Sequence, residues 1–176
     1  MVRVSGIPAP GISASAILTP GIADRIGVYR RSLDDAVEEV FRLMTKTSCL
    51  PVDECPIEER EMISAVIGLA GAMSGICVLS SGETVALRMA ETLSGAAIQR
   101  LNETVKDAVG EICNMVAGAW KARQPLLTSE CMLSTPTVVT GTNYQLHNQR
   151  PEFRVERYYS FEEHSFAVTL ICESMQ

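Results

Sequence analysis

Glu111 and Asn114 stand three positions apart in a helix-forming stretch of this 176-residue chain. Residues at i and i+3 are neighbours on a helix surface, so a carboxylate and an uncharged carboxamide would be presented side by side. A molecule that docks against such a face meets both groups at once. The competing interpretation is a solvated polar face, which is the ordinary state of an exposed helix surface.

The helix that must position this pair is predicted over residues 102–123, and Pro125 ends it. With about 100° per residue, one arc collects five apolar side chains that should be buried: Val105, Val109, Ile112, Val116 and Trp120. The opposite arc collects four residues: Asp107, Glu111, Asn114 and Gly118. The periodicity therefore predicts that Glu111 and Asn114 face solvent.

The composition of this helix favours a docking surface over a plain solvated face. Asn is unfavourable in mid-helix because its amide competes for backbone groups. Gly110 and Gly118 each cost about 0.8–1.0 kcal/mol relative to Ala in a helix interior. We therefore expect four residues around the pair to contact a partner: Asp107, Gly110, Ala117 and Gly118.

The first part of the chain predicts a helix followed by a hairpin. Residues 1–30 are rich in Gly and Pro and are expected to be a flexible N-terminal tail without chemistry, ahead of a single domain over residues 31–176. Ser32 is a good N-cap for a helix over residues 33–46. Residues 62–79 alternate in polarity around a turn at Gly71, which indicates a hairpin.

The next segment carries helix signals at both ends. Ser80 and Glu83 fit a capping box at the start of a helix over residues 84–93. Gly95 follows that helix at the position where a left-handed residue ends it.

The last part of the chain predicts strands near residues 130–139 and a second alternating hairpin over residues 153–161 and 165–172. The order of elements favours an α+β fold, with a mostly antiparallel sheet and long helices packed on one face. Each half begins with an acidic-faced helix and continues into a hairpin, so the sequence suggests two pseudo-repeated halves.

The composition excludes several classes of function. The net charge of −6 disfavours binding to nucleic acid or to an anionic membrane surface. No run of 18 apolar residues exists, which predicts that no helix spans a membrane. No export signal is recognisable at the N-terminus, so a cytoplasmic protein is expected.

The six cysteines and two histidines do not predict a metal site or a disulfide framework. No cysteine pair has CxxC spacing, and the histidines are 17 residues apart. Five of the six cysteines lie in or beside apolar runs, as buried free thiols do. Cys113 lies between Glu111 and Asn114; packing is the favoured role for its thiol, and a redox or nucleophilic role is the alternative.

The run from Asp107 through Glu111 to Asn114, with Pro136 22 positions later, resembles a known signature. It is similar to the (Asp/Ser)-x3-Glu-x2-Asn…Pro motif of the CheC/CheX/FliY phosphatases of bacterial chemotaxis. Residues 83–91 and 136–141 support the resemblance, which extends over about residues 33–173. It implies the CheC-like fold.

The first half offers only degenerate copies of this motif. Two frames exist, Asp34-x3-Glu38-x2-Phe41 and Asp35-x3-Glu39-x2-Arg42, and neither supplies Asn. One intact copy resembles the CheX branch, and that resemblance implies a homodimer. Trp120 departs from the smaller, more polar residue expected there, but its place on the apolar arc should leave the site intact.

The resemblance implies a phosphatase that acts on the aspartyl phosphate of a CheY-type response regulator. Such a protein needs no cofactor of its own, because Mg²⁺ is held by the receiver. Asn114 would orient the attacking water, and Glu111 would pair with a lysine beside the phosphate. Asp107 would favour the N-terminal half of its helix, and Pro136 would shape a neighbouring strand edge.

Two other classes of function compete with this one. A non-catalytic adaptor of the same fold would bind a receiver without hydrolysing anything, and phosphate release distinguishes it from an enzyme. A metal- or nucleotide-dependent enzyme is disfavoured because the sequence lacks the P-loop, GxGxxG, HExxH and GxSxG motifs.

Overall fold

A computed structural model describes residues 20–53, 62–125, 127–142, 144 and 151–175. Its helices and strands follow in this order: α1 (Pro20–Met44), β1 (Cys49–Val52), β2 (Met62–Gly71), β3 (Met73–Gly82), α2 (Glu83–Ser94), α3 (Glu103–Ala122), β4 (Cys131–Leu133), β5 (Thr137–Gly141), β6 (Phe153–Phe161) and β7 (His164–Met175). The α+β prediction is therefore confirmed.

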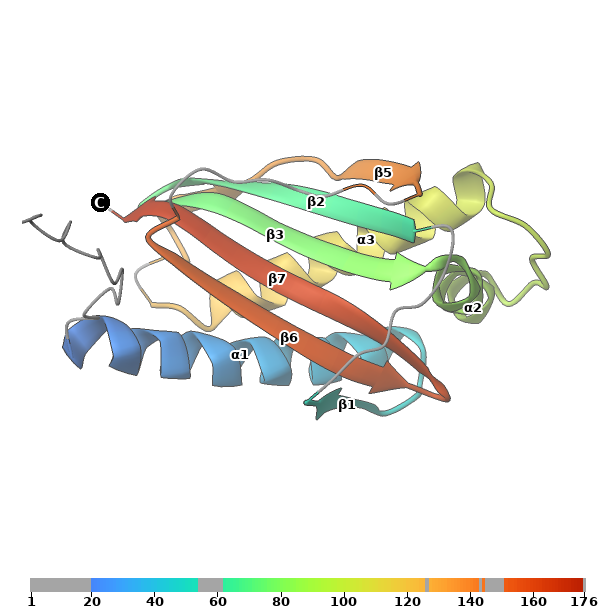
Figure 1. The fold of residues 1–176 in the computed structure, drawn as a ribbon, viewed down its shortest axis with the longest axis horizontal. Coiled ribbons are helices and arrows are strands. Elements are labelled where there is room, and N and C mark those ends of the chain that lie inside the picture. Colours follow the sequence, from blue (N-terminus) through green and yellow to red (C-terminus); the bar gives the residue numbers. More distant parts are fainter. Residues whose placement is uncertain (1–19, 54–61, 126, 143, 145–150, 176) are drawn as a thin grey trace, which may run out of the picture.

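The strands form one seven-stranded sheet in the order β1-β6-β7-β3-β2-β4, with β5 also paired to β2 (Figure 1). Every pairing is antiparallel, as predicted. The predicted hairpins are present as β2–β3 and β6–β7. At the β2–β3 turn Gly71 has φ +120°, and a Cβ there would lie 2.0 Å from the Glu130 carbonyl oxygen, so only glycine fits.

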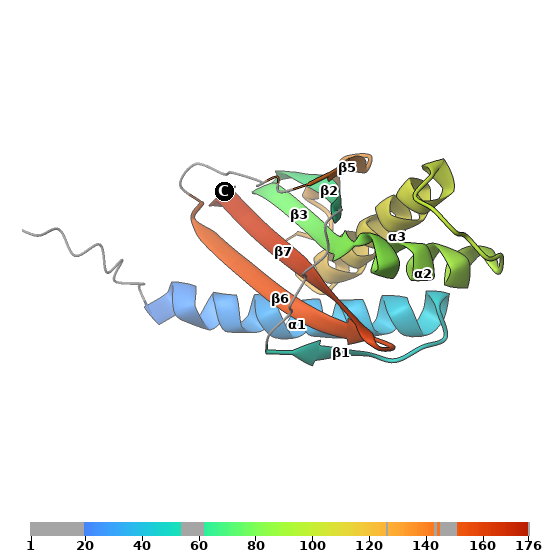
Figure 2. The ribbon, with the colours of Figure 1, turned by 45° about the vertical axis from the view of Figure 1, so that its right-hand side comes forward.

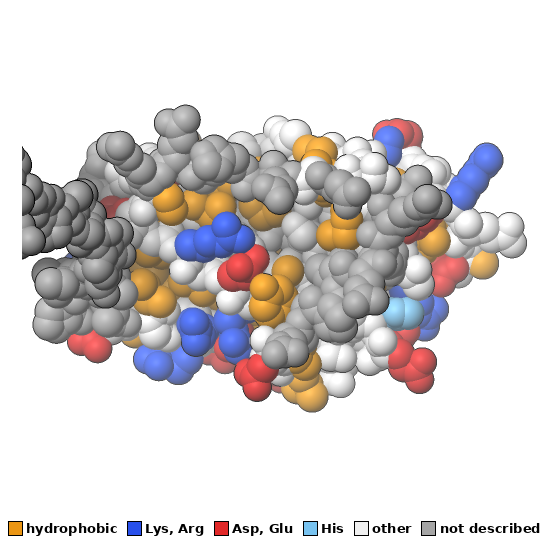
Figure 3. Space-filling view, in the orientation of Figure 1, with side chains coloured by type: hydrophobic (Ala, Val, Ile, Leu, Met, Phe, Trp, Pro, Cys, Tyr) orange, Lys and Arg blue, Asp and Glu red, His pale blue; other side chains and the backbone are white. Residues whose placement is uncertain are grey.

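The three helices cover one face of the sheet, with α1 and α3 beneath it and α2 at one end (Figures 1 and 2). Alternate strand residues and the apolar helix faces meet in one core, whose largest fully buried side chains include Trp120, Tyr159 and Phe41. This arrangement follows from the period of two in the strands and of about 3.6 in the helices. Figure 3 views the other face of the sheet, where charged and hydrophobic side chains are intermixed.

The strand order relates the two halves of the chain to each other. Each half supplies a helix, an edge strand or pair of edge strands, and a hairpin. The edge strand β1 pairs with β6 of the second half, whereas β4 and β5 pair with β2 of the first. The two hairpins meet at the central β3–β7 pairing. The two halves therefore share one continuous sheet.

Helix α1 begins at Pro20, so the expected tail over residues 1–30 and the expected helix start at residue 33 are wrong over residues 20–32. Residues 1–19 lie outside the described residues. Tyr29 is buried and packs on Trp120, with ring centroids 5.6 Å apart, and on Phe153. Contacts with α3 and β6, distant in sequence, thus extend the helix beyond its local signals.

Three further expectations need correction. Ser80 belongs to β3 and bonds to the Ser64 hydroxyl at 2.7 Å, so no capping box forms, and Gly82 is the N-cap of α2. The strand expected near residues 130–139 is two strands, interrupted before Thr137. No strand was predicted at β1, whose four residues include Pro51. An edge strand tolerates that proline.

Candidate functional site

Helix α3 is positioned by a cap at its start and by packing along its length. The Asn102 side chain is the N-cap and accepts a hydrogen bond from the Val105 backbone N–H at 3.1 Å. The predicted apolar arc is buried throughout, and Cys113 and Ala117 extend it. The helix lies between α1 and α2, against β2 and β3.

The opposite side of α3 carries the two residues of the predicted site. Glu111 is exposed, as the periodicity predicts, whereas Asn114 is half-buried. Within the part of the chain that the structure describes, neither side chain has a hydrogen bond or ion pair. Both polar groups are therefore open to a docking molecule. Asp107 is exposed one turn earlier on the same side.

The connection between β4 and β5 closes one flank of this site. A Cβ on Gly110 would lie 3.2 Å from the Pro136 Cβ, and one on Gly118 would lie 3.9 Å from Leu133 Cδ1. Gly110, Asn114 and Gly118 follow one another at four-residue intervals, so Asn114 lies on the helix between these two contacts. The motif proline therefore packs beside the motif helix.

Ser134 anchors this connection to the sheet. Its hydroxyl accepts a hydrogen bond from the Gly68 N–H at 2.8 Å, and its own N–H donates to the Gly68 carbonyl at 2.9 Å. A second hydrogen bond runs from the hydroxyl to the Thr135 carbonyl at 2.9 Å. Sequence reasoning missed Ser134 because its partner is 66 positions away and no local pattern marks the pairing.

Two of the four expected partner-contacting residues are buried. Ala117 is fully inaccessible and belongs to the core, and Gly110 lies under Pro136 and Val138. Gly118 is half-buried, and Asp107 is exposed. The expectation is therefore wrong for Gly110 and Ala117. Their small size serves close packing of β5 and the core against α3, which helix periodicity by itself does not reveal.

The degenerate motif in α1 is used for internal contacts. Asp34 accepts hydrogen bonds from Arg157 Nε and Nη2 and from the Tyr159 hydroxyl, each at 2.9 Å. The hydrogen bond to Asp34 raises the pKa of Arg157. Burial raises the pKa of Tyr159, and the negative charge of Asp34 raises it further. Phe41 is fully buried against Phe161 and Phe166.

The second frame of that motif also makes an internal contact: Glu39 forms an ion pair with Arg123 at the end of α3. The hydrogen bond from Arg123 lowers the pKa of Glu39. Among the described residues, the first half thus offers no free acid–amide pair equivalent to Glu111 and Asn114.

The thiol between the site residues points away from the surface. Cys113 is fully buried and donates a hydrogen bond to the Ala65 carbonyl at 3.4 Å. Its neighbour Cys77 has a raised pKa, through the hydrogen bond with Cys113 and through burial. Five cysteines are free and buried as predicted, and Cys55 lies outside the described residues. Packing is therefore the role that the geometry supports for Cys113.

Within the described ranges, no cluster of three or more His, Cys, Asp or Glu side chains is arranged to hold a metal ion. The helices of that same part of the chain include none long and apolar enough to cross a membrane.

Comparison with known proteins identifies the family. The model of the family "Chemotaxis phosphatase CheX" matches residues 63–156. The chain is 27% identical over 116 residues to "CheY-P phosphatase CheX" of Thermotoga maritima, covering 65% of this chain and 74% of that protein.

Solved structures agree with that assignment. The chemotaxis protein CheX of Vibrio vulnificus is 26% identical, covers 82% of this chain and 95% of its own, and superposes with a TM-score of 0.69. A CheX–CheY–BeF₃–Mg²⁺ complex from Borrelia burgdorferi shares the fold at 20% identity and a TM-score of 0.67, covering 82% of this chain and 96% of its own. The matched segment contains the hairpin β2–β3, both motif residues of α3 and Pro136, and the chain belongs to the CheX family of chemotaxis phosphatases.

Proposed function

We propose that this protein hydrolyses the aspartyl phosphate of a CheY-type response regulator, with Asn114 and Glu111 as the residues that act. The observation that carries the proposal is the pair itself: a carboxylate and a carboxamide one turn apart on an open helix face, without partners among the described residues. Membership of the CheX family and the similarity to a protein named a CheY-P phosphatase support it.

The reaction needs little help beyond an oriented water. A water oxygen forms a bond to phosphorus while the bond between phosphorus and the aspartyl carboxylate oxygen breaks. The products are the free carboxylate and inorganic phosphate, and the proton that the water loses passes to phosphate or solvent. The transition state is loose, so positioning contributes more than base strength.

Asn114 is suited to this task because its carboxamide oxygen accepts a hydrogen bond from the water and carries no charge. A carboxylate at the same place would be repelled by the phosphoryl oxygens. Glu111, one turn earlier, would bind a cationic side chain of the receiver and so align the helix with its phosphorylation pocket.

The remaining assignments accompany this proposal. Mg²⁺ would be held by the receiver, while this chain contributes no cofactor. The resemblance to CheX proteins supports a homodimer, a cytoplasmic location, and a single domain for the chain after its N-terminal segment.

The test measures the lifetime of the aspartyl phosphate on a panel of phosphorylated CheY-type receivers, with and without this protein. The wild type should shorten the lifetime of at least one of them. Asn114→Ala should abolish that effect, a loss of at least about 100-fold for removing the water-orienting group, yet still bind the same receiver loaded with BeF₃ and Mg²⁺.

Two outcomes would contradict the proposal. Full activity of Asn114→Ala would show that the carboxamide does not orient the attacking water. Tight binding by the wild type without any change in phosphate lifetime would identify a non-catalytic adaptor instead.

A further inference from the structure

A groove lies between α2 and α3, beside the proposed site. It has a volume of about 450 Å³. Its floor is apolar, formed by Ala90 and Leu93 of α2 and Ala108 of α3, and the exposed residues Ser94 and Thr104 stand on its two walls. Asp107 and Glu111 also line it.

The groove is continuous with the proposed catalytic face. Glu111 belongs to both, and Asn114 follows it by one turn, about 4.5 Å along the helix axis. A protein that brings a phosphoryl group over Asn114 therefore covers the mouth of the groove as well. The surface that contacts the phosphorylation pocket of the receiver and the groove that contacts the neighbouring part of the receiver would then be adjacent parts of α3.

The groove is preformed, because the loop that joins α2 to α3 is fixed to α2. The carboxylate of Glu91 accepts a hydrogen bond from the Ile98 N–H at 3.0 Å, and Glu83 accepts one from the Leu101 N–H at 3.4 Å. Gly95 ends α2 in the left-handed conformation, with φ +70°. A fixed groove loses less conformational entropy on binding than one that must form.

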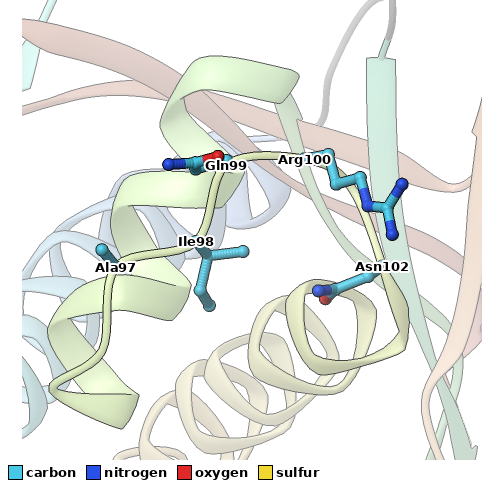
Figure 4. A pocket seen from close by; sticks show the side chains of 5 residues that line it. All are labelled: Ala97, Ile98, Gln99, Arg100 and Asn102. Atoms are coloured by element: carbon cyan, nitrogen blue, oxygen red, sulfur yellow. The ribbon is translucent and has the colours of Figure 1, made fainter.

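The loop itself carries a second hollow of about 560 Å³ (Figure 4). Ile98 and Asn102 point into the space between the loop and α3, while Gln99 and Arg100 point in opposite directions.

The charges of the groove define what it can bind. Asp107 and Glu111 have no cationic partner among the residues that the structure describes; the nearby Lys106 pairs with Glu103 at 2.7 Å. Two uncompensated carboxylates above an apolar floor favour an aliphatic side chain that is followed by a lysine or arginine. A free anion would be repelled.

We propose that this groove is the specificity surface for the phosphorylated receiver. It takes a segment of the receiver beside its phosphorylation pocket, which inserts an aliphatic side chain between α2 and α3 and places a cation against Asp107. This inference rests on the proposed phosphatase function and adds the determinant of receiver choice.

The test fills the groove without touching Asn114 or Glu111. Ser94→Trp and Thr104→Trp change exposed residues on opposite walls, and Thr104→Lys places a cation three positions before Asp107 on the same helix. With the receiver that the wild type dephosphorylates, each variant should raise KM by at least about tenfold while kcat stays within about twofold, as expected for lost uniform binding.

Ser174→Trp is the matched control, because it places the same side chain on an exposed serine of β7 at the opposite end of the sheet (Figure 1). Its KM should equal that of the wild type. An active wild type with unchanged KM in all three folded groove variants overturns the groove alone. A wild type that is inactive on every receiver overturns the phosphatase proposal and the groove with it.

Discussion

Asn114 combines two properties that rarely coincide in mid-helix: a polar side chain with little helix propensity, and a half-buried position on an otherwise open face. Among the described residues, no hydrogen bond to the Asn114 amide offsets its low helix propensity. Residues that break a local rule without internal compensation are candidates for function. Glu111 satisfies helix propensity, so its spacing to Asn114 is what marks it.

The role proposed for Glu111 predicts that its loss weakens binding of the receiver. Glu111→Ala should raise KM for the phosphorylated receiver by about fivefold, within the range of one solvent-exposed ion pair. The same variant should weaken the dependence of KM on salt, because one intermolecular charge pair is gone. Steady-state dephosphorylation at low and high salt measures both effects.

Glu130→Ala supplies the control for that experiment, since Glu130 is an exposed carboxylate in the turn before β4. It should leave KM and its salt dependence unchanged. If KM depended equally on salt in Glu111→Ala and the wild type, Glu111 would not form an ion pair with the receiver.

At the scale of elements, α3 and the connection from β4 to β5 act as one unit. Ser134 holds that connection to β2, and Pro136 rests on Gly110. The two glycines of α3 therefore differ in what they allow. Because Gly110 has no side chain, Pro136 and Val138 pack closely against the helix there. A Cβ on Gly118, by contrast, would meet only Leu133, at ordinary van der Waals distance.

This difference predicts that the same substitution, Gly to Ala, changes the free energy of unfolding differently at the two positions. Gly118→Ala should raise the free energy of unfolding by about 0.5–1 kcal/mol, because helix propensity improves without a clash. Gly110→Ala should give less stabilisation or a loss, because its methyl group must displace Pro136. Urea denaturation of both variants tests this, and an equal gain for both would show that Pro136 yields without cost.

The sequence predicted the elements that carry strong local signals and missed those that depend on distant partners. The hairpins β2–β3 and β6–β7, the end of α2 at Gly95 and the whole of α3 follow from periodicity and capping. Strand β1 has only four residues and contains Pro51. It exists because it pairs with β6, about 110 positions later.

At the scale of the whole molecule, the two halves of the chain use their helical acidic residues differently. In the first-half helix α1, Asp34 is bound to Arg157 and Tyr159, and Glu39 to Arg123. The other two acids of its motif-like frames, Asp35 and Glu38, are exposed. The second-half helix keeps Glu111 and Asn114 open. One half thus contributes internal contacts where the other presents the site.

The Asp34 cluster predicts a structural defect on substitution. Asp34→Ala leaves Arg157 and the buried Tyr159 hydroxyl without their acceptor, so the free energy of unfolding should fall by about 2–3 kcal/mol. The adjacent Asp35→Ala changes an exposed side chain and should stay within about 0.5 kcal/mol. Denaturation curves compare the two, and equal losses would argue against the cluster.

The ion pair between α2 and the β6–β7 turn predicts a pH dependence. Arg88 Nε and Nη2 donate to Glu162 at 2.7 and 3.0 Å, and the hydrogen bond from Arg88 lowers the pKa of Glu162. A carboxyl whose pKa is lowered by folding stabilises the fold above its unfolded pKa and loses that contribution as pH falls through its folded pKa.

The wild type should therefore be slightly more stable than Glu162→Gln at about pH 6, and the difference should vanish by about pH 3. Thermal unfolding of both proteins across that range tests the prediction. A difference that stays constant with pH would exclude the Arg88 pair as its cause.

By itself the sequence determined the fold class, the two hairpins and the placement of Glu111 and Asn114 on the side of α3 opposite its apolar arc, because each depends on residues within a few turns or one strand of one another. Only the tertiary structure decided that Gly110 and Ala117 are buried, that α1 extends to Pro20, and that a groove lies beside the site. These features arise where segments far apart in the chain pack together. Periodicity reports which face of an element is apolar, but it carries no information about which segment will cover that face.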